Sequence, residues 1–373
     1  MLDTSIQGPL GGRELSRRDF LKFCSLMAGV LALPRSYAKK FEKALAAPQR
    51  TPVVWLEFQD CAGCTEALLR ASRPTVAELV LDILSVDYHE TIMAASGKRA
   101  EEAKKATVEQ GGYLLIVEGS IPAAEDGIYC CIGGRTALDI LDEAASNALA
   151  VIAVGSCATF GGIPKASPNP TGAVSVMDLV TDKPVLNLPG CPYNPVNLTA
   201  TVVHFLTFGE LPAMDDLHRP LFAYGALIHD NCERRGHFNA GEFVEAWGDE
   251  GHRKGWCLYK MGCKGPVTYH NCPAVRYNDG TNWPIGSGHG CIGCSEPDFW
   301  ELGVYNHAEL HRFTPPETYA PVYPPEQKIA PASAALMGGL AGLAVGAAGV
   351  AAYNALTKPE QEDESGDSPE TES

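Results

Sequence analysis

Short apolar runs alternate with helix-like segments from Pro52 to about residue 190. The apolar runs cover residues 53–58, 113–117, 150–154 and 185–188, and the helical patterns cover residues 65–71, 75–84 and 137–145. Alternation of this kind predicts an α/β domain built on a largely parallel sheet. We expect this domain to span residues 48–220.

The periodic pattern ends near Leu221. Residues 221–328 are rich in Gly, Pro, His and Asn and show no clear helical or strand period. A segment of this length is unusual in a compact domain unless something other than an apolar core holds it together. Bound metal clusters would do so, and the sequence therefore predicts a second, irregular, cluster-stabilised domain over residues 221–328.

The start of the chain has the composition of a targeting signal. Arg17 and Arg18 precede an apolar stretch over residues 23–33, and Ala/Lys-rich residues follow as far as Ala47. This order is typical of a twin-arginine signal peptide, so we exclude residues 1–47 from the predicted fold. Cleavage near Ala38 and cleavage near Ala47 both fit. The alternative is an Arg-Arg pair that happens to precede a buried helix.

Residues 329–356 carry no charged side chain. An uncharged helix over residues 332–356 would be about 37 Å long, which is enough to cross a bilayer. Gly338, Gly342 and Gly346 recur at every fourth position and would form a smooth face for packing against another membrane helix. The sequence predicts a transmembrane anchor, with a buried Gly/Ala-rich segment as the alternative, because the stretch is only moderately hydrophobic.

Acidic residues outnumber basic ones over the whole chain. There are 45 Asp and Glu residues against 29 Lys and Arg residues, and the formal net charge is −16. Residues 357–373 are mostly acidic or polar and predict a disordered tail. No basic stripe or base-stacking motif occurs elsewhere, so we exclude nucleic-acid binding.

Ten of the 13 cysteines, together with one histidine, fall into three sets by position. Thiolates in such numbers are typical ligands of iron–sulfur clusters. The first set is Cys61, Cys64, Cys157 and Cys191; the second is His229, Cys232, Cys257 and Cys263; the third is Cys272, Cys291 and Cys294. Cys24, Cys130 and Cys131 remain, and we expect them to be signal-peptide or packing residues.

Two other uses of these cysteines must be weighed against iron–sulfur clusters. A disulfide framework is common in exported proteins, but a chain of this length can bury a large core without it. Structural zinc explains a single Cys-x2-Cys motif, yet three incomplete zinc sites would be unusual. Cysteines of the first set follow the apolar runs directly, so we expect them to meet at the carboxyl ends of parallel strands, where α/β sheets bind their ligands.

Five motifs together resemble the small, iron–sulfur subunit of membrane-bound, periplasmic nickel–iron uptake hydrogenases. They are Cys61-x2-Cys64-Thr65-Glu66, Glu118-Gly119-Ser120-Ile121-Pro122, Gly155-Ser156-Cys157, Pro189-Gly190-Cys191-Pro192 and the run from His289 to Pro297. The resemblance implies a flavodoxin-like N-terminal domain and a separate large subunit that holds the nickel–iron site, so no catalytic residue is expected in this chain. It also implies H2 as the substrate of the complex, a quinone-linked or cytochrome partner in the membrane, and a location on the periplasmic side.

The same resemblance assigns a cluster to each set of ligands. The first set corresponds to a proximal [4Fe–4S] cluster, the third to a medial [3Fe–4S] cluster and the second to a distal [4Fe–4S] cluster. Pro284 stands where a fourth medial cysteine would be. Oxygen-tolerant members carry two additional cysteines near the proximal cluster, and these places are Gly63 and Gly162 here. A quinone-reductase subunit with a related proximal domain would lack the second and third sets.

Overall fold

The computed structural model describes residues 17–46, 50–71, 84–301 and 310, which all belong to one compact unit within residues 1–319. The predicted anchor at 329–356, the acidic tail and residues 1–16 of the predicted signal lie outside the described residues. Among the residues that are described, no helix is both long enough and apolar enough to cross a membrane.

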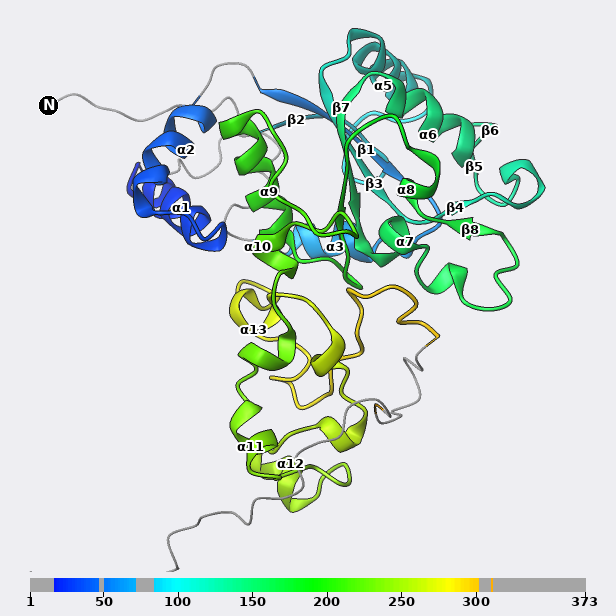
Figure 1. Ribbon diagram of the computed structural model, residues 1–373. Coiled ribbons are helices and arrows are strands. Elements are labelled where there is room, and N and C mark those ends of the chain that lie inside the picture. The colour runs from blue at the N-terminus through cyan, green and yellow to red at the C-terminus, as the bar shows by residue number, and fades with distance from the viewer. Residues whose placement is uncertain (1–16, 47–49, 72–83, 302–309, 311–373) are drawn as a thin grey trace, which may run out of the picture. The chain divides into compact units, whose positions relative to one another are not determined.

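The N-terminal domain is built on a five-stranded parallel sheet (Figure 1). Its strands, in spatial order, are β2 (Leu84–His89), β1 (Thr51–Glu57), β3 (Tyr113–Glu118), β7 (Ala148–Val154) and β9 (Val185–Leu188). Counted along the chain, this is the 2-1-3-4-5 order of flavodoxin-like sheets. The four predicted strands are therefore confirmed, and so is their parallel arrangement.

Alternate strand residues supply two separate cores, one on each face of the sheet. On one face, Val54 and Leu56 pack with helices α5 (Lys98–Gln110) and α6 (Ala137–Ser146). On the other face, Val53 and Trp55 pack in one cluster with α9 (Pro195–Phe208). Figure 1 shows α5 and α6 on one side of the sheet and α9 on the other.

Shorter elements complete this domain. The helices are α3 (Gly63–Leu69), α7 (Gly155–Phe160) and α8 (Val176–Leu179), with 3-10 turns η3 (Ala124–Gly127) and η4 (Ile163–Lys165). Two small antiparallel ladders pair β4 (Ile121–Pro122) with β8 (Ala173–Val174), and β5 (Cys131–Ile132) with β6 (Arg135–Thr136). Helices α3 and α7 begin just after β1 and β7, at the carboxyl ends of the strands.

The sequence pattern predicted a helix over residues 75–84. Leu84 instead begins strand β2, so the prediction is wrong at that residue, and residues 75–83 lie outside the described residues. Strand β2 pairs with β1 alone and lies at the edge of the sheet. Its half-buried Ser85 and Asp87 interrupt the apolar run. A strand buried on one side only lacks the continuous hydrophobic sequence that marks the central strands, which is why the pattern missed it.

The N-terminal segment differs from expectation because residues 17–46 pack onto the sheet domain. Helices α1 (Arg17–Val30) and α2 (Ala38–Leu45), joined through the 3-10 turn η1 (Arg35–Tyr37), share one apolar cluster with α9. Cys24, Met27 and Phe41 are each 0% exposed. The segment is therefore part of the described fold, and its role as a targeting signal stays a prediction.

The region after Leu221 is irregular, as expected. Its described residues form no ladder of paired strands, and their helices have four or five residues each. These are α10 (Leu221–Tyr224), α11 (Arg235–Asn239), α12 (Glu250–Lys254) and α13 (Cys272–Val275), with 3-10 turns η5 (Ile228–Asn231), η6 (Tyr259–Met261) and η7 (Gly265–Val267). Candidate ligand cysteines are themselves members of the small apolar clusters in this region.

Candidate metal centres

The structure brings the four cysteines of the proximal set together at the carboxyl ends of three strands. Burial, the charge of Glu118 and the thiols of Cys157 and Cys191 raise the pKa of Cys64 well above its ordinary value. Burial, with a contribution from the thiol of Cys61, also raises the pKa of Cys157 and that of Cys191. Two hydrogen bonds join the loop that carries Cys157 to the loop that carries Cys191. Ser156 N donates to Gly190 O at 2.9 Å, and Gly190 N donates to Ser156 Oγ at 2.9 Å.

Two glycines keep the space beside these thiols open. Gly155 has φ +80°, and a Cβ atom there would lie 2.3 Å from Cys64 Sγ. Gly162 has φ +61°, and its Cβ would lie 2.6 Å from Cys157 Sγ. Any side chain at either place would collide with the thiol and strain the backbone. Glycine at each place therefore allows the loop backbone to approach the cysteine sulfur closely.

Backbone N–H groups point at the candidate ligand sulfurs throughout the chain. In the second domain the donor lies two residues after the cysteine: Arg234 N donates to Cys232, Gly265 N to Cys263 and Gly293 N to Cys291, at 3.3–3.4 Å. Such donors stabilise the negative charge of a thiolate or cluster. Burial raises the pKa of Cys157 to about 12, so this group is a thiol until a metal displaces its proton.

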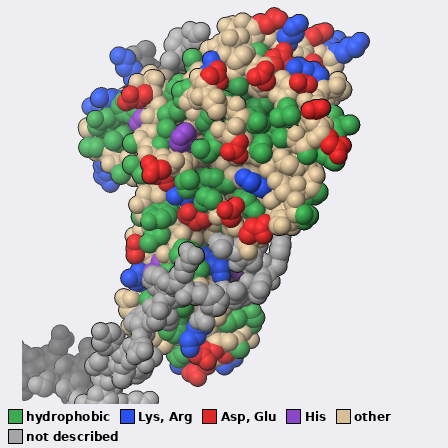
Figure 2. All heavy atoms as spheres, turned by 45° about the vertical axis from the view of Figure 1, so that its right-hand side comes forward, with side chains coloured by type: hydrophobic (Ala, Val, Ile, Leu, Met, Phe, Trp, Pro, Cys, Tyr) green, Lys and Arg blue, Asp and Glu red, His purple; other side chains and the backbone are tan. Residues whose placement is uncertain are grey.

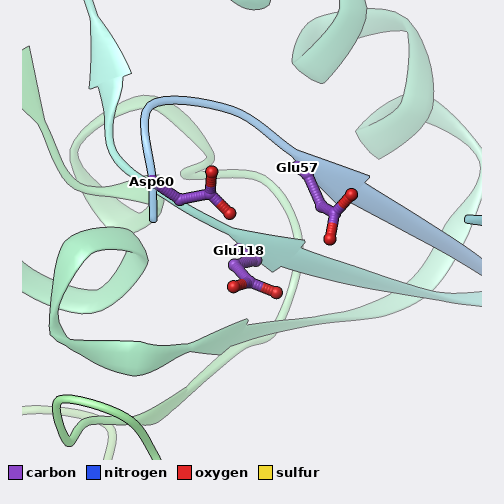
Figure 3. Close-up of side chains that lie close together, drawn as sticks. All are labelled: Glu57, Asp60 and Glu118. Atoms are coloured by element: carbon purple, nitrogen blue, oxygen red, sulfur yellow. The ribbon is translucent and has the colours of Figure 1, made fainter. Parts of the chain in front are cut away.

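Three carboxyl groups lie beside the proximal set, and the cysteine pattern did not predict them. One oxygen atom of each of Glu57, Asp60 and Glu118 lies within 4.8 Å of the others. Figure 3 shows these three side chains gathered at the ends of β1 and β3. Burial raises the pKa of all three, that of Glu118 to about 7. The sequence did contain a signal for two of these carboxyl groups, because Glu57 and Glu118 each end an otherwise largely apolar strand, β1 and β3.

Thr65 joins two of these carboxyl groups to the proximal loop. Its hydroxyl lies 2.8 Å from Glu57 Oε1 and 2.6 Å from Glu118 Oε2, while Cys64 N and Thr65 N donate to Glu118 Oε1 at 3.0 and 3.2 Å. A hydroxyl has only one hydrogen. Both carboxyl groups are satisfied when Glu118 is protonated and donates to Thr65, which in turn donates to Glu57. The network positions the start of α3, where Cys64 lies.

The medial set is gathered in the second domain. Cys272 and Cys291 are buried in one apolar cluster with Trp283 and Ile285, the two neighbours of Pro284 in the sequence. Burial and the thiol of Cys294 raise the pKa of Cys272 above its ordinary value.

The imidazole of His270 is a contact of the medial set that the sequence did not reveal. Its Nδ1 lies 3.0 Å from Cys272 Sγ, and the side chain is 2% exposed. Burial, with a contribution from Arg219, lowers the pKa of His270 to about 3. The imidazole is therefore neutral and carries a hydrogen on only one of its two ring nitrogens.

The structure also gathers the distal set. Burial, together with the thiols of Cys263 and Cys232, raises the pKa of Cys257 to about 12. The ring of His229 packs edge-on against Phe238 at 4.5 Å, and Phe238 belongs to the same apolar cluster as Cys257. Burial, with Arg235 nearby, lowers the pKa of His229 to about 4. A neutral imidazole is the form that binds metals.

Direct contacts connect the three sets in one order. Ser156, which precedes Cys157 of the proximal set, donates its hydroxyl hydrogen to the backbone oxygen of Cys294 in the medial set. Cys291 of the medial set donates its N–H to Cys263 Sγ of the distal set at 3.3 Å, and Lys264 N donates to Cys291 O at 2.7 Å. The medial set therefore lies between the other two.

The remaining cysteines have no part in these sets. Cys24 is fully buried on the inner face of α1, Cys130 is half-buried against the α5/α6 core, and Cys131 is exposed. All thirteen cysteines lie within the described residues, and none is paired in a disulfide, which contradicts the disulfide alternative. On the face shown in Figure 2, acidic side chains are scattered over the surface and basic ones form no stripe.

A flavodoxin-like domain followed by an irregular domain, with three thiolate sets in contact, defines an electron-transfer protein of the iron–sulfur class. Residues 224–305 match the C-terminal family model of the NiFe/NiFeSe hydrogenase small subunit, and residues 61–205 match the model of the NADH ubiquinone oxidoreductase 20 Kd subunit. The second match covers only the proximal domain. The first distinguishes this chain from a quinone-reductase subunit.

Two relatives and a solved structure extend these matches. The chain is 45% identical over 354 residues to the Hydrogenase-2 small chain of Escherichia coli (strain K12), covering 94% of this chain and 95% of the relative. It is 47% identical over 305 residues to the Quinone-reactive Ni/Fe-hydrogenase small chain of Wolinella succinogenes, covering 80% and 86%. The reduced Ni-Fe-Se hydrogenase of Desulfomicrobium baculatum matches with 36% identity and a TM-score of 0.66, over 70% of this chain and 100% of that one. The chain therefore belongs to the small subunits of NiFe hydrogenases.

Proposed function

We propose that this chain conducts electrons released by H2 oxidation in a hydrogenase large subunit, through three iron–sulfur clusters, to a redox partner in the membrane. The observation that carries the proposal is a pair of hydrogen bonds between the ligand loops: Ser156, beside Cys157, donates to Cys294 O, and Cys291 N donates to Cys263 Sγ. They bring neighbouring ligand sets into contact in the order proximal, medial, distal. One-electron carriers held at these sets would be close neighbours.

The proposed ligand sets are those of the sequence prediction. Two [4Fe–4S] clusters and one [3Fe–4S] cluster would supply one-electron redox chemistry when bound. The proximal cluster is held by Cys61, Cys64, Cys157 and Cys191, the medial one by Cys272, Cys291 and Cys294, and the distal one by His229, Cys232, Cys257 and Cys263.

The protein's own contribution is burial and hydrogen bonding. Apolar side chains such as Trp283 and Phe238 pack with the buried cysteines of the medial and distal sets. Tyr193 packs in one cluster with Cys64, whereas Cys61 and Cys191 are exposed in this chain. Backbone N–H groups compensate the charge of the thiolates. Three thiolates rather than four at the medial set, and a neutral imidazole at the distal set, reduce the negative ligand charge, which raises a cluster's potential.

Metal and sulfide analysis of the purified complex tests this function. We expect about eleven iron atoms and about twelve acid-labile sulfides in the small subunit, since the proposal contains two [4Fe–4S] clusters and one [3Fe–4S] cluster. A hydrogenase large subunit should also copurify. Zinc in place of iron, or a colourless protein without sulfide, would contradict the proposal and favour a zinc scaffold.

His270 is expected to raise the potential of the medial cluster. A metal-bound Cys272 is a thiolate and can only accept, so Nδ1 of the neutral His270 must carry the hydrogen and donate to it. An N–H···S bond favours the more negative, reduced state. His270→Phe removes the donor and keeps much of the volume, so the medial midpoint potential should fall in a redox titration followed by electron paramagnetic resonance.

His270→Asn provides the matched control. Its amide can still donate from the same backbone position, so its potential should fall less than that of His270→Phe. Equal shifts in the two variants would show that the ring's packing, rather than its hydrogen bond, matters. An unchanged potential in both would rule out a contact between this side chain and the cluster.

We further propose a periplasmic location with a membrane anchor. The support is the twin-arginine pattern in residues 1–47 and the uncharged stretch at 329–356. Deleting the chain from Ala332 onward should release a soluble complex that still reduces artificial dyes but no longer reduces quinone, because this stretch supplies no ligand. Activity measured in membrane and soluble fractions checks this. A truncated enzyme that stays firmly membrane-bound would contradict a C-terminal anchor.

A further inference from the structure

Residues 17–46 form a helical hairpin whose apolar stripe is buried. Cys24, Met27, Ala28 and Leu31 follow the i, i+3, i+4, i+7 spacing of one helix face and are at most 7% exposed. Leu26, on the same helix, is 47% exposed. The helix is thus buried on one side only, as expected for a helix docked on a protein surface.

Helix α2 makes the aromatic part of this contact. Phe41 is 0% exposed, and its ring meets Phe208 of α9 at 6.4 Å with an interplanar angle of 84°. Tyr37 lies 5.9 Å from the same ring. Edge-to-face pairs of this kind favour a defined arrangement beyond simple burial. Figure 1 shows α1 and α2 lying beside α9.

Helix α9 is covered on more than one side. Every residue from Pro195 to Val203 except Val196 is buried. A helix lying on a sheet ordinarily buries one face and exposes polar residues on the other. The outer part of α9 ends instead in Phe205, Leu206 and Phe208, which pack into the cluster shared with the hairpin.

We propose that this outer face of α9 is a docking surface for residues 17–46, which stores the apolar export segment on the folded body until the export machinery pulls it away. The export role rests on the proposed twin-arginine signal; the docking does not. A free segment would expose its apolar residues to water. Docking competes with any receptor for the same residues, because only the released fraction can bind.

Hydrogen–deuterium exchange on the full-length chain in its complex tests the docking. We expect amides of residues 24–31 and 38–45 to be protected in the wild type. Phe208→Ser, on the body, and Phe41→Ser, on the segment, should each lose that protection, while the β3 and β7 amides keep theirs. Leu26→Ser, on the exposed side of α1, is the matched control and should behave like the wild type. Free exchange of the segment in the wild type, or equal losses in Phe41→Ser and Leu26→Ser, would overturn the proposal.

A pulse-chase experiment in cells tests the consequence for export. Phe208→Ser leaves the signal sequence unchanged, so its precursor should be converted to the processed form faster than the wild type. An unchanged rate in a variant whose segment is released would show that docking does not limit export. If the wild-type precursor is never exported, the signal role fails, and the exchange data still decide whether the segment docks.

Discussion

Hydrogen oxidation by the assembled enzyme is expected to collapse when oxygen is added, and to recover only after reduction. The oxygen-tolerant relatives described above carry two additional cysteines beside the proximal cluster, and this chain has Gly63 and Gly162 at those places. Under the proposed ligand set, four thiolates would hold an ordinary four-iron centre, which would be unable to deliver the additional electron that helps to reduce oxygen at the nickel–iron site. Protein-film electrochemistry measures the current directly. Sustained turnover in air would overturn this expectation.

In the structure, Cys130 does not pack in the same core as Cys64. Cys64 packs with the apolar cluster on the α9 side of the sheet, whereas Cys130 packs with the cluster on the α5/α6 side. Cys130→Ser should therefore leave the oxygen response unchanged, and it serves as the control. A cysteine at position 162 would place its Cβ 2.6 Å from Cys157 Sγ in the present backbone, so a fifth thiol there requires the loop to move.

Expressed without iron–sulfur assembly, the chain is expected to be cleaved by proteases throughout residues 221–301. The apolar clusters of this region are small, and Cys263, Cys272 and Cys291 are members of one of them. Metal binding in such a domain is itself folding free energy, on the order of 10 kcal/mol for structural metal sites. Limited proteolysis with mass spectrometry locates the cuts. The flavodoxin-like sheet, which has two cores of its own, should resist longer.

A pair of variants separates ligand loss from a general effect of removing a thiol. Cys263→Ser removes a proposed distal ligand that is 7% exposed, and it should make the second domain sensitive even when clusters are supplied. Cys131→Ser changes an exposed cysteine outside the three sets and should have no effect. Full protection of residues 221–301 in metal-free protein would refute the idea that clusters hold this domain together.

Local sequence patterns were sufficient for four of the five strands of the sheet. β1, β3, β7 and β9 are buried continuous apolar runs, and that signal is contained in a few consecutive residues. Edge strand β2 was missed because Ser85 and Asp87 interrupt its apolar sequence. Helix α9 was missed because it is covered on several sides and so lacks the alternation of an ordinary surface helix.

The sequence by itself determined the class of fold, the three candidate ligand sets and the family, because periodicity, spacing and motifs are local properties of the chain. Only the tertiary structure decided which sets touch, through the hydrogen bonds from Ser156, beside Cys157, to Cys294 and from Cys291 to Cys263. It alone placed His270 against Cys272 and the apolar stripe of residues 17–46 against α9. These contacts join segments through side-chain packing and hydrogen bonds in three dimensions, and no repeat or spacing along the chain encodes them.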